Sequence, residues 1–348
     1  MNERWMIYGA NGYTGELLAR LAAARGRRPV LAGRSATAVG ALADELGLDW
    51  AVVDLADAPG LRSALRDVAV VAHCAGPFVR TAGPMVDACL ATGTSYLDVT
   101  GELAVYSSVL ARSGEAVEAR VSLVTGAGFD VVPTDCLANL LCQALPGARS
   151  LELAFRAPGG MSRGTAATGL ADIAGGGRRL IDGVLVPTPL GEPEREVPFP
   201  SRTRRVGAVP WGDLVTAHHS TGIGTITVYT TMAPRLGVRR LAAGLLRYDG
   251  MRALAARAIR HLPAGPSAPT RSATGIEVWG QAVSPDGSVS GTLTGPNAYD
   301  LTADAVLQAV ARVLAGGVPV GAHTPATAFG ADFVRGLDGV VVSDVGRP

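Results

Sequence analysis

Lysine is absent from this 348-residue chain, so all 31 basic side chains are arginines. The absence excludes Schiff-base chemistry on lysine, the lysine of a P-loop and the Tyr-x-x-x-Lys pair of short-chain reductases. Because 30 acidic residues bring the formal net charge to +1, the overall charge gives no attraction to nucleic acid. We therefore expect no nucleic-acid partner and acid–base chemistry that does not use lysine.

Cysteine and long apolar runs are also scarce. The four cysteines form no CxxC pair and the five histidines form no HExxH pattern, so we predict no structural or catalytic metal. No apolar run reaches the length of about 18 residues that a membrane-spanning helix needs. The sequence enters a strand without a signal-peptide pattern, and we therefore predict a cytoplasmic protein.

The opening of the chain holds its most informative motif. Residues 5–8 predict a strand, residues 16–25 favour a helix, and glycines three apart lie between them. Glycines permit a tight turn and the close approach of a pyrophosphate, and the helix start directs N–H groups and its positive dipole end at the phosphates. We predict that a dinucleotide binds the seven residues of this turn, Gly9, Ala10, Asn11, Gly12, Tyr13, Thr14 and Gly15.

The end of the second predicted strand indicates which dinucleotide binds. Residues 28–33 are followed by Arg34 and Ser35, where an NAD enzyme usually carries a carboxylate for the ribose 2′-hydroxyl. A guanidinium and a hydroxyl suit a 2′-phosphate instead, so we predict NADP(H). The alternative is that Arg34 is merely solvated and Ser35 only caps the next helix, which we expect to end at Gly47.

Two further strand ends supply cofactor candidates. Asp54 ends the third predicted strand, residues 50–55, where it would either bind the adenine amino group or start a helix as Asp57 does. The fourth strand, residues 68–72, is continuously apolar, as expected of a parallel strand that is buried on both faces. We predict that the nicotinamide half lies along the segment after it, Cys74, Ala75, Gly76 and Pro77, although a purely structural turn would look similar.

Six strands alternate with helices over the first 130 residues or so, which predicts a doubly wound parallel α/β sheet. After Pro133 the pattern changes: residues 175–212 suggest long loops or a hairpin, residues 214–232 suggest strand, and residues 275–294 suggest a β-hairpin. The predicted fold class is therefore α/β, a Rossmann doubly wound parallel sheet with an inserted α+β domain. The predicted domains are an NADP-binding domain at 1–132, an α+β domain at 133–320, for which the family resemblance described below implies substrate and dimer contacts, and a C-terminal helix and tail at 321–348 that packs back on the first domain.

The segment 235–262 is the most basic of the chain, with seven arginines against one aspartate. Leucines and alanines between the arginines predict an amphipathic helix with a basic face. Such a helix suits peripheral contact with membrane lipid or with an acidic carrier protein. The alternative is a solvated helix that covers the sheet.

Six motifs in this order resemble the saccharopine dehydrogenase-like family, and within it the branch of trans-acting enoyl reductases from actinobacterial lipid and polyketide pathways. They are Gly9–Gly15, Cys74–Phe78, Tyr96–Glu102, Gly128–Asp135, Ser162–Thr165 and His323–Ala326. The resemblance implies a Rossmann domain, an inserted α+β domain for substrate and dimer contacts, and NADPH-dependent reductase activity. We accordingly expect a homodimer.

The function predicted from this resemblance is reduction of a polarised C=C bond, in an enoyl or related intermediate of lipid, polyketide or other secondary metabolism. The substrate is free or carrier-bound. Arg163, Thr165 or backbone N–H groups of residues 126–129 would stabilise the enolate, and Glu102 or Asp130 would supply the proton. The same carboxylates would equally serve as helix caps, and Arg163 lies in an ordinary capping sequence. Alternatives are a C=N reductase or amino-acid dehydrogenase, and a non-catalytic NADP-binding partner protein.

Overall fold

The structure is a computed structural model that describes residues 3–231, 244 and 248–346. Its contacts divide the chain into two units, residues 1–132 with 299–333 and residues 133–298 with 334–348. One boundary coincides with the predicted one at 132/133. The other lies at 298/299 rather than 320/321, because the long helix α13 (Ala298–Leu314) packs within the first unit. The roles assigned to the two parts remain predictions.

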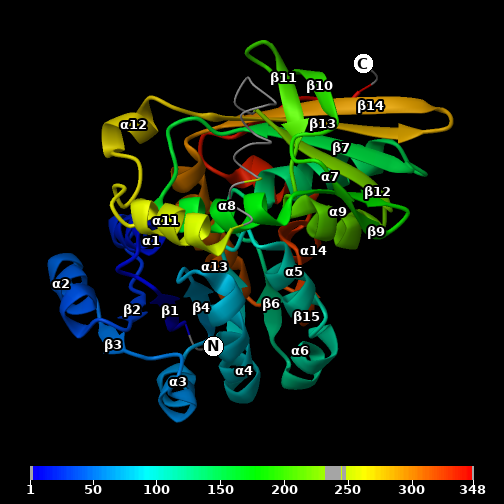
Figure 1. Cartoon of the computed structure of the whole chain (residues 1–348). Helices are drawn as coiled ribbons and strands as arrows, with labels where there is room; N and C mark the ends of the chain where they lie inside the picture. The colour runs from blue at the N-terminus through cyan, green and yellow to red at the C-terminus, as the bar shows by residue number, and fades with distance from the viewer. Residues whose placement is uncertain (1–2, 232–243, 245–247, 347–348) are drawn as a thin grey trace. The chain divides into compact units, whose positions relative to one another are not determined.

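The first unit contains a seven-stranded parallel sheet in the order β15-β6-β5-β4-β1-β2-β3 (Figure 1). Its strands are β1 (Trp5–Tyr8), β2 (Val30–Gly33), β3 (Trp50–Val52), β4 (Val70–His73), β5 (Ser95–Asp98), β6 (Ser122–Val124) and β15 (Gly321–His323). All six predicted strands are present, and the order of β1 to β6 is that of a dinucleotide-binding sheet. The predicted fold class is therefore confirmed. The seventh strand was not predicted, since it comes from the far end of the chain.

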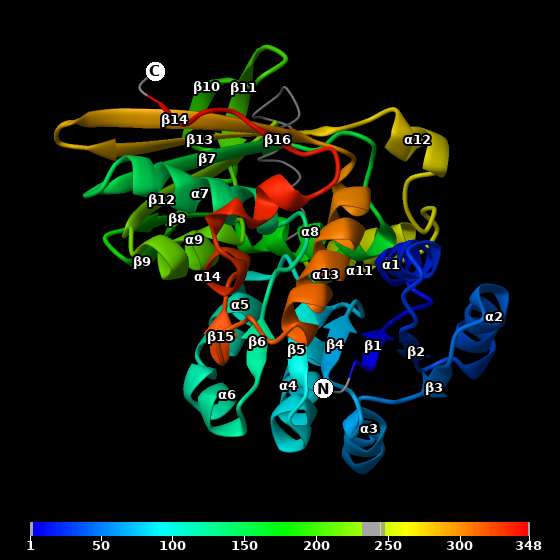
Figure 2. The same ribbon diagram turned by 180° about the vertical axis from the view of Figure 1, so that it is seen from behind.

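Helices cover both faces of this sheet. α4 lies in front of the strands in Figure 1, and α13 lies in front of them in Figure 2, which is turned by 180°. The helices of the first half are α1 (Tyr13–Ala24), α2 (Ala36–Leu46), α3 (Ala58–Leu65), α4 (Phe78–Thr92), α5 (Leu103–Leu110) and α6 (Ser113–Ala119). The double cover explains why all four residues of β1 and of β4 are buried. α2 follows the prediction at both ends, with Ser35 as its cap and Gly47 at φ +64° as its stop.

The second unit contains a mixed sheet in the order β10-β11-β12-β7-β13-β14-β16, with β8 and β9 paired outside this path. Its strands are β7 (Ser150–Arg156), β8 (Gly177–Ile181), β9 (Val184–Thr188), β10 (Glu194–Pro198), β11 (Thr203–Ala208), β12 (Thr225–Thr230), β13 (Ile276–Ser284), β14 (Gly287–Gly295) and β16 (Val341–Val342). The predicted hairpin is β13–β14, and the predicted antiparallel character holds except for the parallel pair β7–β12.

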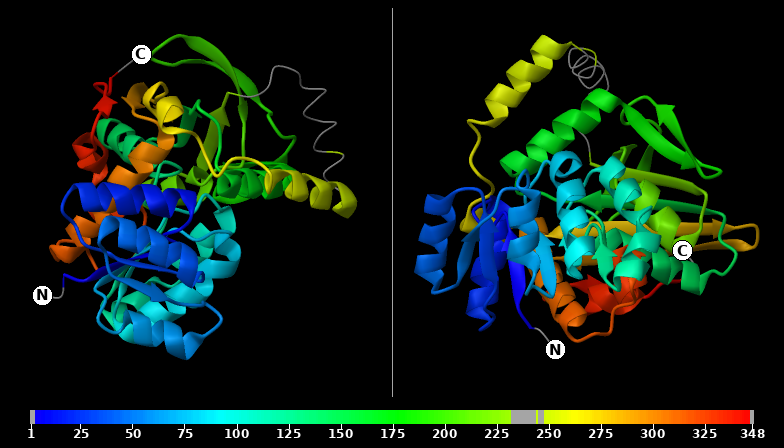
Figure 3. Two further views of the ribbon diagram at one scale, coloured as in Figure 1. Left: turned by 90° about the vertical axis from the view of Figure 1, so that its left-hand side faces the viewer. Right: turned by 90° about the horizontal axis from the view of Figure 1, so that it is seen from below.

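The helices of the second unit are α7 (Val132–Ala144), α8 (Arg163–Gly175), α9 (Asp213–Thr221), α11 (Asp249–Ile259) and α12 (Ala268–Ser272). α11 lies beside α8 (Figure 3). It is the described part of the predicted basic helix, whereas residues 232–243 and 245–247 lie outside the described residues. In the part of the chain that the structure describes, no helix combines the length and the apolar character needed to cross a bilayer.

One prediction about the second unit was wrong. Residues 214–221 form α9 rather than strand, because Asp213 lies in its first turn and Gly222, at φ +74°, ends it; only β12 keeps the period of two. Of the alternatives stated for residues 175–212, long loops or a hairpin, the hairpin is present twice, as β8–β9 and β10–β11. The C-terminal segment is divided, since residues 321–333 belong to the first unit and residues 334–348 belong to the second, where β16 pairs with β14.

Candidate functional site

The opening turn is too tight for side chains at two of its three glycines. Gly9 has φ +81°, and a Cβ atom there would lie 2.8 Å from the Cβ of Ala75. A Cβ atom on Gly15 would lie 2.3 Å from the carbonyl oxygen of Gly9. The turn is also held internally, since Gly9 donates its N–H to Ala32 at 2.8 Å and Gly12 donates to Gly9 at 2.9 Å. Helix α1 therefore starts directly against the end of β1.

The N-cap residue of α1 is Gly12, which has no side chain to accept the first N–H groups of the helix. The neighbouring helices differ: Ser35 accepts from the N–H of Ala38 at the start of α2, and Asp57 accepts from the N–H of Gly60 at the start of α3. The first N–H groups of a helix have no acceptor within the helix and carry the positive end of its dipole. The start of α1 is therefore suited to bind an anion at the carboxyl end of β1.

The ends of β2 and β3 lie beside this turn. A Cβ atom on Gly33 would lie 2.9 Å from the Oδ1 atom of Asn11, so the Asn11 side chain reaches the end of β2. The hydroxyl of Tyr8 donates to the carbonyl oxygen of Val53 at 3.1 Å. Burial raises the pKa of Tyr8, the charge of Asp54 raises it further, and the charge of Arg34 lowers it. Both charged groups therefore lie near the Tyr8 hydroxyl, at the edge that carries the turn.

The predicted residues at this edge are not equivalent. Arg34 is exposed, as a ligand for an external phosphate must be. The Ser35 hydroxyl caps α2, and Oδ1 of Asp54 accepts from the N–H of Ala56 at 2.9 Å. The alternative stated for Ser35 is thus present, whereas Asp54 forms a local turn before α3 rather than starting that helix, whose N-cap is Asp57. These contacts leave Arg34 as the strongest candidate for discriminating between the two dinucleotides.

The segment after β4 lies against the turn. Cys74 donates its N–H to Tyr8 at 2.8 Å, and Ala75 is the residue that Gly9 approaches. The Ala75 carbonyl accepts from the Thr81 hydroxyl at 2.7 Å, which fixes the segment, whereas Gly76 and Pro77 are exposed. Burial, with a smaller effect of Asp98, raises the pKa of the Cys74 thiol to about 12. This thiol is therefore no nucleophile near neutral pH.

Glu102 caps helix α4. Its Oε1 atom accepts from the N–H of Phe78 at 2.8 Å, and its Oε2 atom accepts from the N–H of Val79 at 2.7 Å. A carboxylate in this position satisfies two helix-start donors and faces the positive end of the helix dipole. The alternative stated from the sequence, that this residue caps a helix, is what the structure contains.

The other two predicted catalytic residues lie in different units. Asp130 belongs to the first unit and is half-buried, and its Oδ2 atom lies 2.6 Å from where a Cβ atom on Gly101 would be. Glu102 and Asp130 thus come from adjoining loops of one unit. Arg163 is exposed in the second unit, where it starts α8 and donates its N–H to Ala264 at 3.1 Å.

Asp98 is a residue of this edge to which the sequence analysis gave no role. It is buried at the end of β5, its Oδ1 atom accepts from the N–H groups of Thr100 and Gly126, at 3.1 and 2.8 Å, and its Oδ2 atom accepts from the Thr125 hydroxyl at 2.9 Å. Burial raises the pKa of Asp98 to about 6 against the effect of these donors. The sequence feature that could have identified Asp98 is its position at the end of a predicted strand, within the motif Tyr96–Glu102.

Asp98 also corrects one expectation about the site. The backbone N–H groups of residues 126–129 were expected to stabilise an enolate. The N–H of Gly126 donates to Oδ1 of Asp98 at 2.8 Å, and the N–H of Ala127 donates to the backbone carbonyl of Asp98 at 2.7 Å. The N–H of Phe129 donates to the Thr302 hydroxyl at 2.9 Å. Because these donors already have acceptors within the protein, we do not assign them to a substrate.

His73, at the end of β4, was also missed. It is fully buried, and burial lowers its pKa to about 3, so its ring is neutral at physiological pH. Its Nε2 atom lies 3.1 Å from the hydroxyl oxygen of Thr81. The residue therefore packs the end of the strand rather than exchanging protons with solvent. Among the described residues, no three His, Cys, Asp or Glu side chains lie together as metal ligands would.

Comparison with known proteins agrees with this geometry. Residues 5–124 match the family model described as the saccharopine dehydrogenase NADP binding domain. These residues lie within the first unit. The resemblance inferred from the sequence is thereby confirmed, and the model's description agrees with the predicted cofactor, NADP(H).

Two mycobacterial relatives each match 37% of the chain. A Mycobacterium tuberculosis protein named as a candidate trans-acting enoyl reductase is 38% identical over 140 residues, and the trans-acting enoyl reductase of Mycobacterium ulcerans is 34% identical over 138 residues. Each alignment covers 37% of this chain and 33% of the relative. The chain therefore matches only about a third of the length of these relatives.

A solved structure matches the whole chain. Apo saccharopine dehydrogenase (L-Glu forming) from Saccharomyces cerevisiae covers 98% of this chain and 100% of its own, with a TM-score of 0.67 and 13% sequence identity. At this identity the match speaks for the fold alone. The similarity of fold covers nearly the whole chain.

Proposed function

We propose that this protein is an NADPH-dependent reductase that acts on a polarised C=C bond, such as that of an enoyl thioester. The observation that carries the proposal is the opening turn, where two glycines exclude side chains and the N-cap residue of α1 is a third glycine, Gly12. The match of residues 5–124 to an NADP binding domain supports the cofactor, and the names of the mycobacterial relatives support the reaction.

Arg34 would bind the 2′-phosphate that distinguishes NADP(H) from NAD(H). It is exposed and directly follows Gly33, the end of β2 that the Asn11 side chain of the turn reaches, and its charge lowers the pKa of Tyr8. A guanidinium can donate two parallel hydrogen bonds to a phosphate, whereas it offers no matched partner to a ribose hydroxyl. The turn residues 9–15 would hold the pyrophosphate, and Cys74–Pro77 would lie along the nicotinamide half.

Bound NADPH would supply a hydride to the β-carbon of the substrate, while a proton is added at the α-carbon, so that NADP⁺ and a saturated thioester result. The protein must stabilise the enolate oxygen and deliver the proton. We assign the first task to Arg163 with Thr165, and the second to Asp130 or to water. Glu102 serves as a positioning residue, because both of its oxygens accept N–H groups of α4.

We also propose how the substrate is delivered. Three apolar side chains in and around α11 are exposed: Tyr248 just before the helix, Leu254 within it and Leu262 after it are 69%, 59% and 46% exposed. Arg257 and Arg260, between Leu254 and Leu262 in the sequence, are also exposed. Exposed apolar side chains among cations suit an anionic partner, either membrane lipid or an acidic carrier protein that holds the substrate. A homodimer in the cytoplasm completes the proposal, and size-exclusion chromatography with light scattering tests the oligomeric state.

An assay with two substrates and two cofactors tests the proposal. A crotonyl-type thioester and a cyclic imine are offered with NADPH and with NADH. Oxidation of NADPH with the thioester supports the C=C reductase. Turnover of the imine alone would replace it with a C=N reductase or amino-acid dehydrogenase. Binding of NADPH without turnover of either substrate would indicate a non-catalytic partner protein.

A further inference from the structure

Three arginines and one carboxylate lie near one another in the second unit. Arg156 ends β7, and its Nη1 atom lies 3.0 Å from the Oε2 atom of Glu277 on β13. Ser201 donates its N–H to Oε1 of Glu277 at 2.7 Å and its hydroxyl to Oε2 at 3.0 Å. The Glu277 side chain is 8% exposed and both of its oxygens accept hydrogen bonds, so its single negative charge offsets one positive charge of the cluster, that of the paired Arg156.

The other two arginines, Arg202 and Arg204, follow Ser201 along the β10–β11 hairpin. Arg204 is half-buried, and among the described residues its Nε atom is buried with no hydrogen-bond partner. Burial lowers the pKa of Arg204, the charges of Arg156 and Arg202 lower it further, and only Glu277 acts in the opposite direction. The cluster therefore holds three cations and one anion, with an unused donor in its interior.

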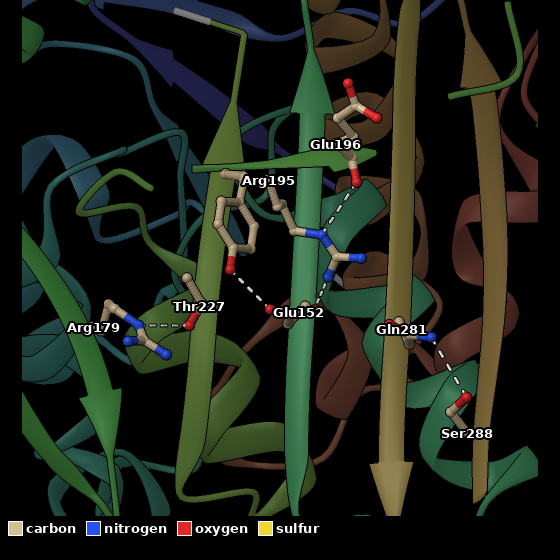
Figure 4. Close-up of polar contacts among 8 residues, drawn as sticks. Glu152, Arg179, Arg195, Glu196, Thr227, Gln281 and Ser288 are labelled. Atoms are coloured by element: carbon tan, nitrogen blue, oxygen red, sulfur yellow. Dashed lines mark hydrogen bonds and ion pairs between the residues drawn. The ribbon is translucent and has the colours of Figure 1, made fainter. Parts of the chain in front are cut away.

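The hairpin that carries Arg202 and Arg204 is fastened to the sheet. Arg195 of β10 forms an ion pair with Glu152 of β7, and its guanidinium lies 4.7 Å from the centre of the Trp279 ring. The Tyr229 hydroxyl donates to the same Glu152 carboxylate at 2.8 Å (Figure 4). Together with the bonds from Ser201 to Glu277, these contacts fix the backbone on which the two arginines lie. A ligand would thus find these two arginines on an ordered support.

We propose that Arg156, Arg202 and Arg204 form a binding site for a phosphate group in the second unit. Two guanidinium charges remain after Glu277 compensates Arg156, which matches the two negative charges of a phosphate monoester better than the single charge of a carboxylate. The planar fork of arginine fits phosphate oxygens in pairs, and the buried Nε of Arg204 gains an acceptor. The phosphate comes either from inorganic phosphate or from an ester such as that of coenzyme A.

Calorimetric titration of the full chain tests the site. Inorganic phosphate and coenzyme A are titrated separately into the parent protein, an R202Q variant and an R202Q/R204Q variant. We expect the double variant to bind the better probe at least about tenfold more weakly, because two charge-assisted hydrogen bonds are lost. R202Q, which changes an exposed side chain and leaves Glu277 paired, is expected to weaken binding as well. The probe that binds more tightly identifies the source of the phosphate.

Arg205→Gln is the matched control. Arg205 has the same charge one residue away, but its side chain is 77% exposed and lies 2.5 Å from Glu194. An equal loss of binding in R205Q, or no binding of either probe to the parent protein, would overturn the proposal. NADPH is titrated in parallel. It should bind the double variant as it binds the parent, which separates this test from a failure of the dinucleotide site.

Discussion

Helices α1 and α4 follow neighbouring strands of the first sheet, yet their starts are built in opposite ways. α1 begins at Gly12 with no side chain as a cap, whereas both oxygens of Glu102 accept the first N–H groups of α4. Each helix start attracts a negative charge. The protein supplies that charge at α4 and leaves α1 for an external anion. The contrast teaches that the dinucleotide site is defined as much by a missing cap as by the glycines.

The largest effect is expected from crowding the turn at α1. A valine at Gly15 would place Cβ 2.3 Å from the Gly9 carbonyl oxygen, which the helix cannot avoid without moving off β1. We expect Gly15→Val to abolish NADPH binding and to lower the free energy of unfolding by about 3 kcal/mol or more. Urea unfolding and fluorescence titration measure the two effects.

Gly114→Ala is the control for this prediction. Gly114 lies inside α6 and is not followed by proline, and a Cβ atom there meets nothing within 4 Å beyond its chain neighbours, so alanine should leave binding unchanged and should not destabilise the helix. Equal damage in both variants would mean that the turn has no special constraint.

The next largest effect is expected from the titration of Asp98, whose carboxylate accepts hydrogen bonds from the loops after β5 and β6. Because the folded pKa of Asp98 is raised from 3.8 to about 6, the folded state retains a proton that the unfolded state has lost between these values. The contribution of Asp98 to the free energy of unfolding therefore falls as pH rises from about 4 to 6, by about 2–3 kcal/mol.

Asp98→Asn removes this titration and keeps an oxygen for the N–H groups of Thr100 and Gly126. The stability of the parent relative to this variant should decline across the same pH interval, as measured by urea midpoints. A difference that is independent of pH would contradict the raised pKa.

Reversal of the charge at Arg34 is expected to alter cofactor choice rather than stability. We predict that Arg34→Asp weakens NADPH binding by about 100-fold and brings NADH to equal or better affinity, since an aspartate repels the 2′-phosphate and accepts from the ribose hydroxyls. Arg27→Asp makes the same charge change at an exposed position of the first unit and should affect neither cofactor. An unchanged preference in Arg34→Asp would remove this arginine from the site.

Much of this edge was predictable from the sequence because it depends on short-range constraints. The glycine turn, the cap of α2 at Ser35 and its stop at Gly47 follow from residues within a few positions of each other. The β13–β14 hairpin was equally local. The α4 cap was offered only as an alternative, because Glu102 and Phe78 are 24 residues apart. The sequence marks such a carboxylate as a strand-end residue without saying whose N–H groups it will accept.

Other features required the folded chain. β15 joins β6 from about 200 residues away, and the role of Asp98 emerges only when the loops after β5 and β6 meet. Arg156, Arg204 and Glu277 come from three strands with no sequence pattern in common. The segment that forms α9 was predicted as strand because a short apolar stretch fits the period of a helix or of a strand. The structural signal for a helix is Gly222, which ends α9 in the left-handed conformation.

The smallest effect is expected at the helix start that the protein caps itself. Glu102→Ala removes the acceptor of two N–H groups of α4, so we expect the free energy of unfolding to fall by about 1–2 kcal/mol. The uncapped start then resembles that of α1, and phosphate added to the buffer should stabilise this variant more than the parent. With NADPH and an enoyl thioester, kcat should fall by less than about tenfold, as a positioning residue requires. A loss of about a thousandfold in kcat, with stability and NADPH affinity unchanged, would instead make Glu102 the proton donor and end the comparison with α1.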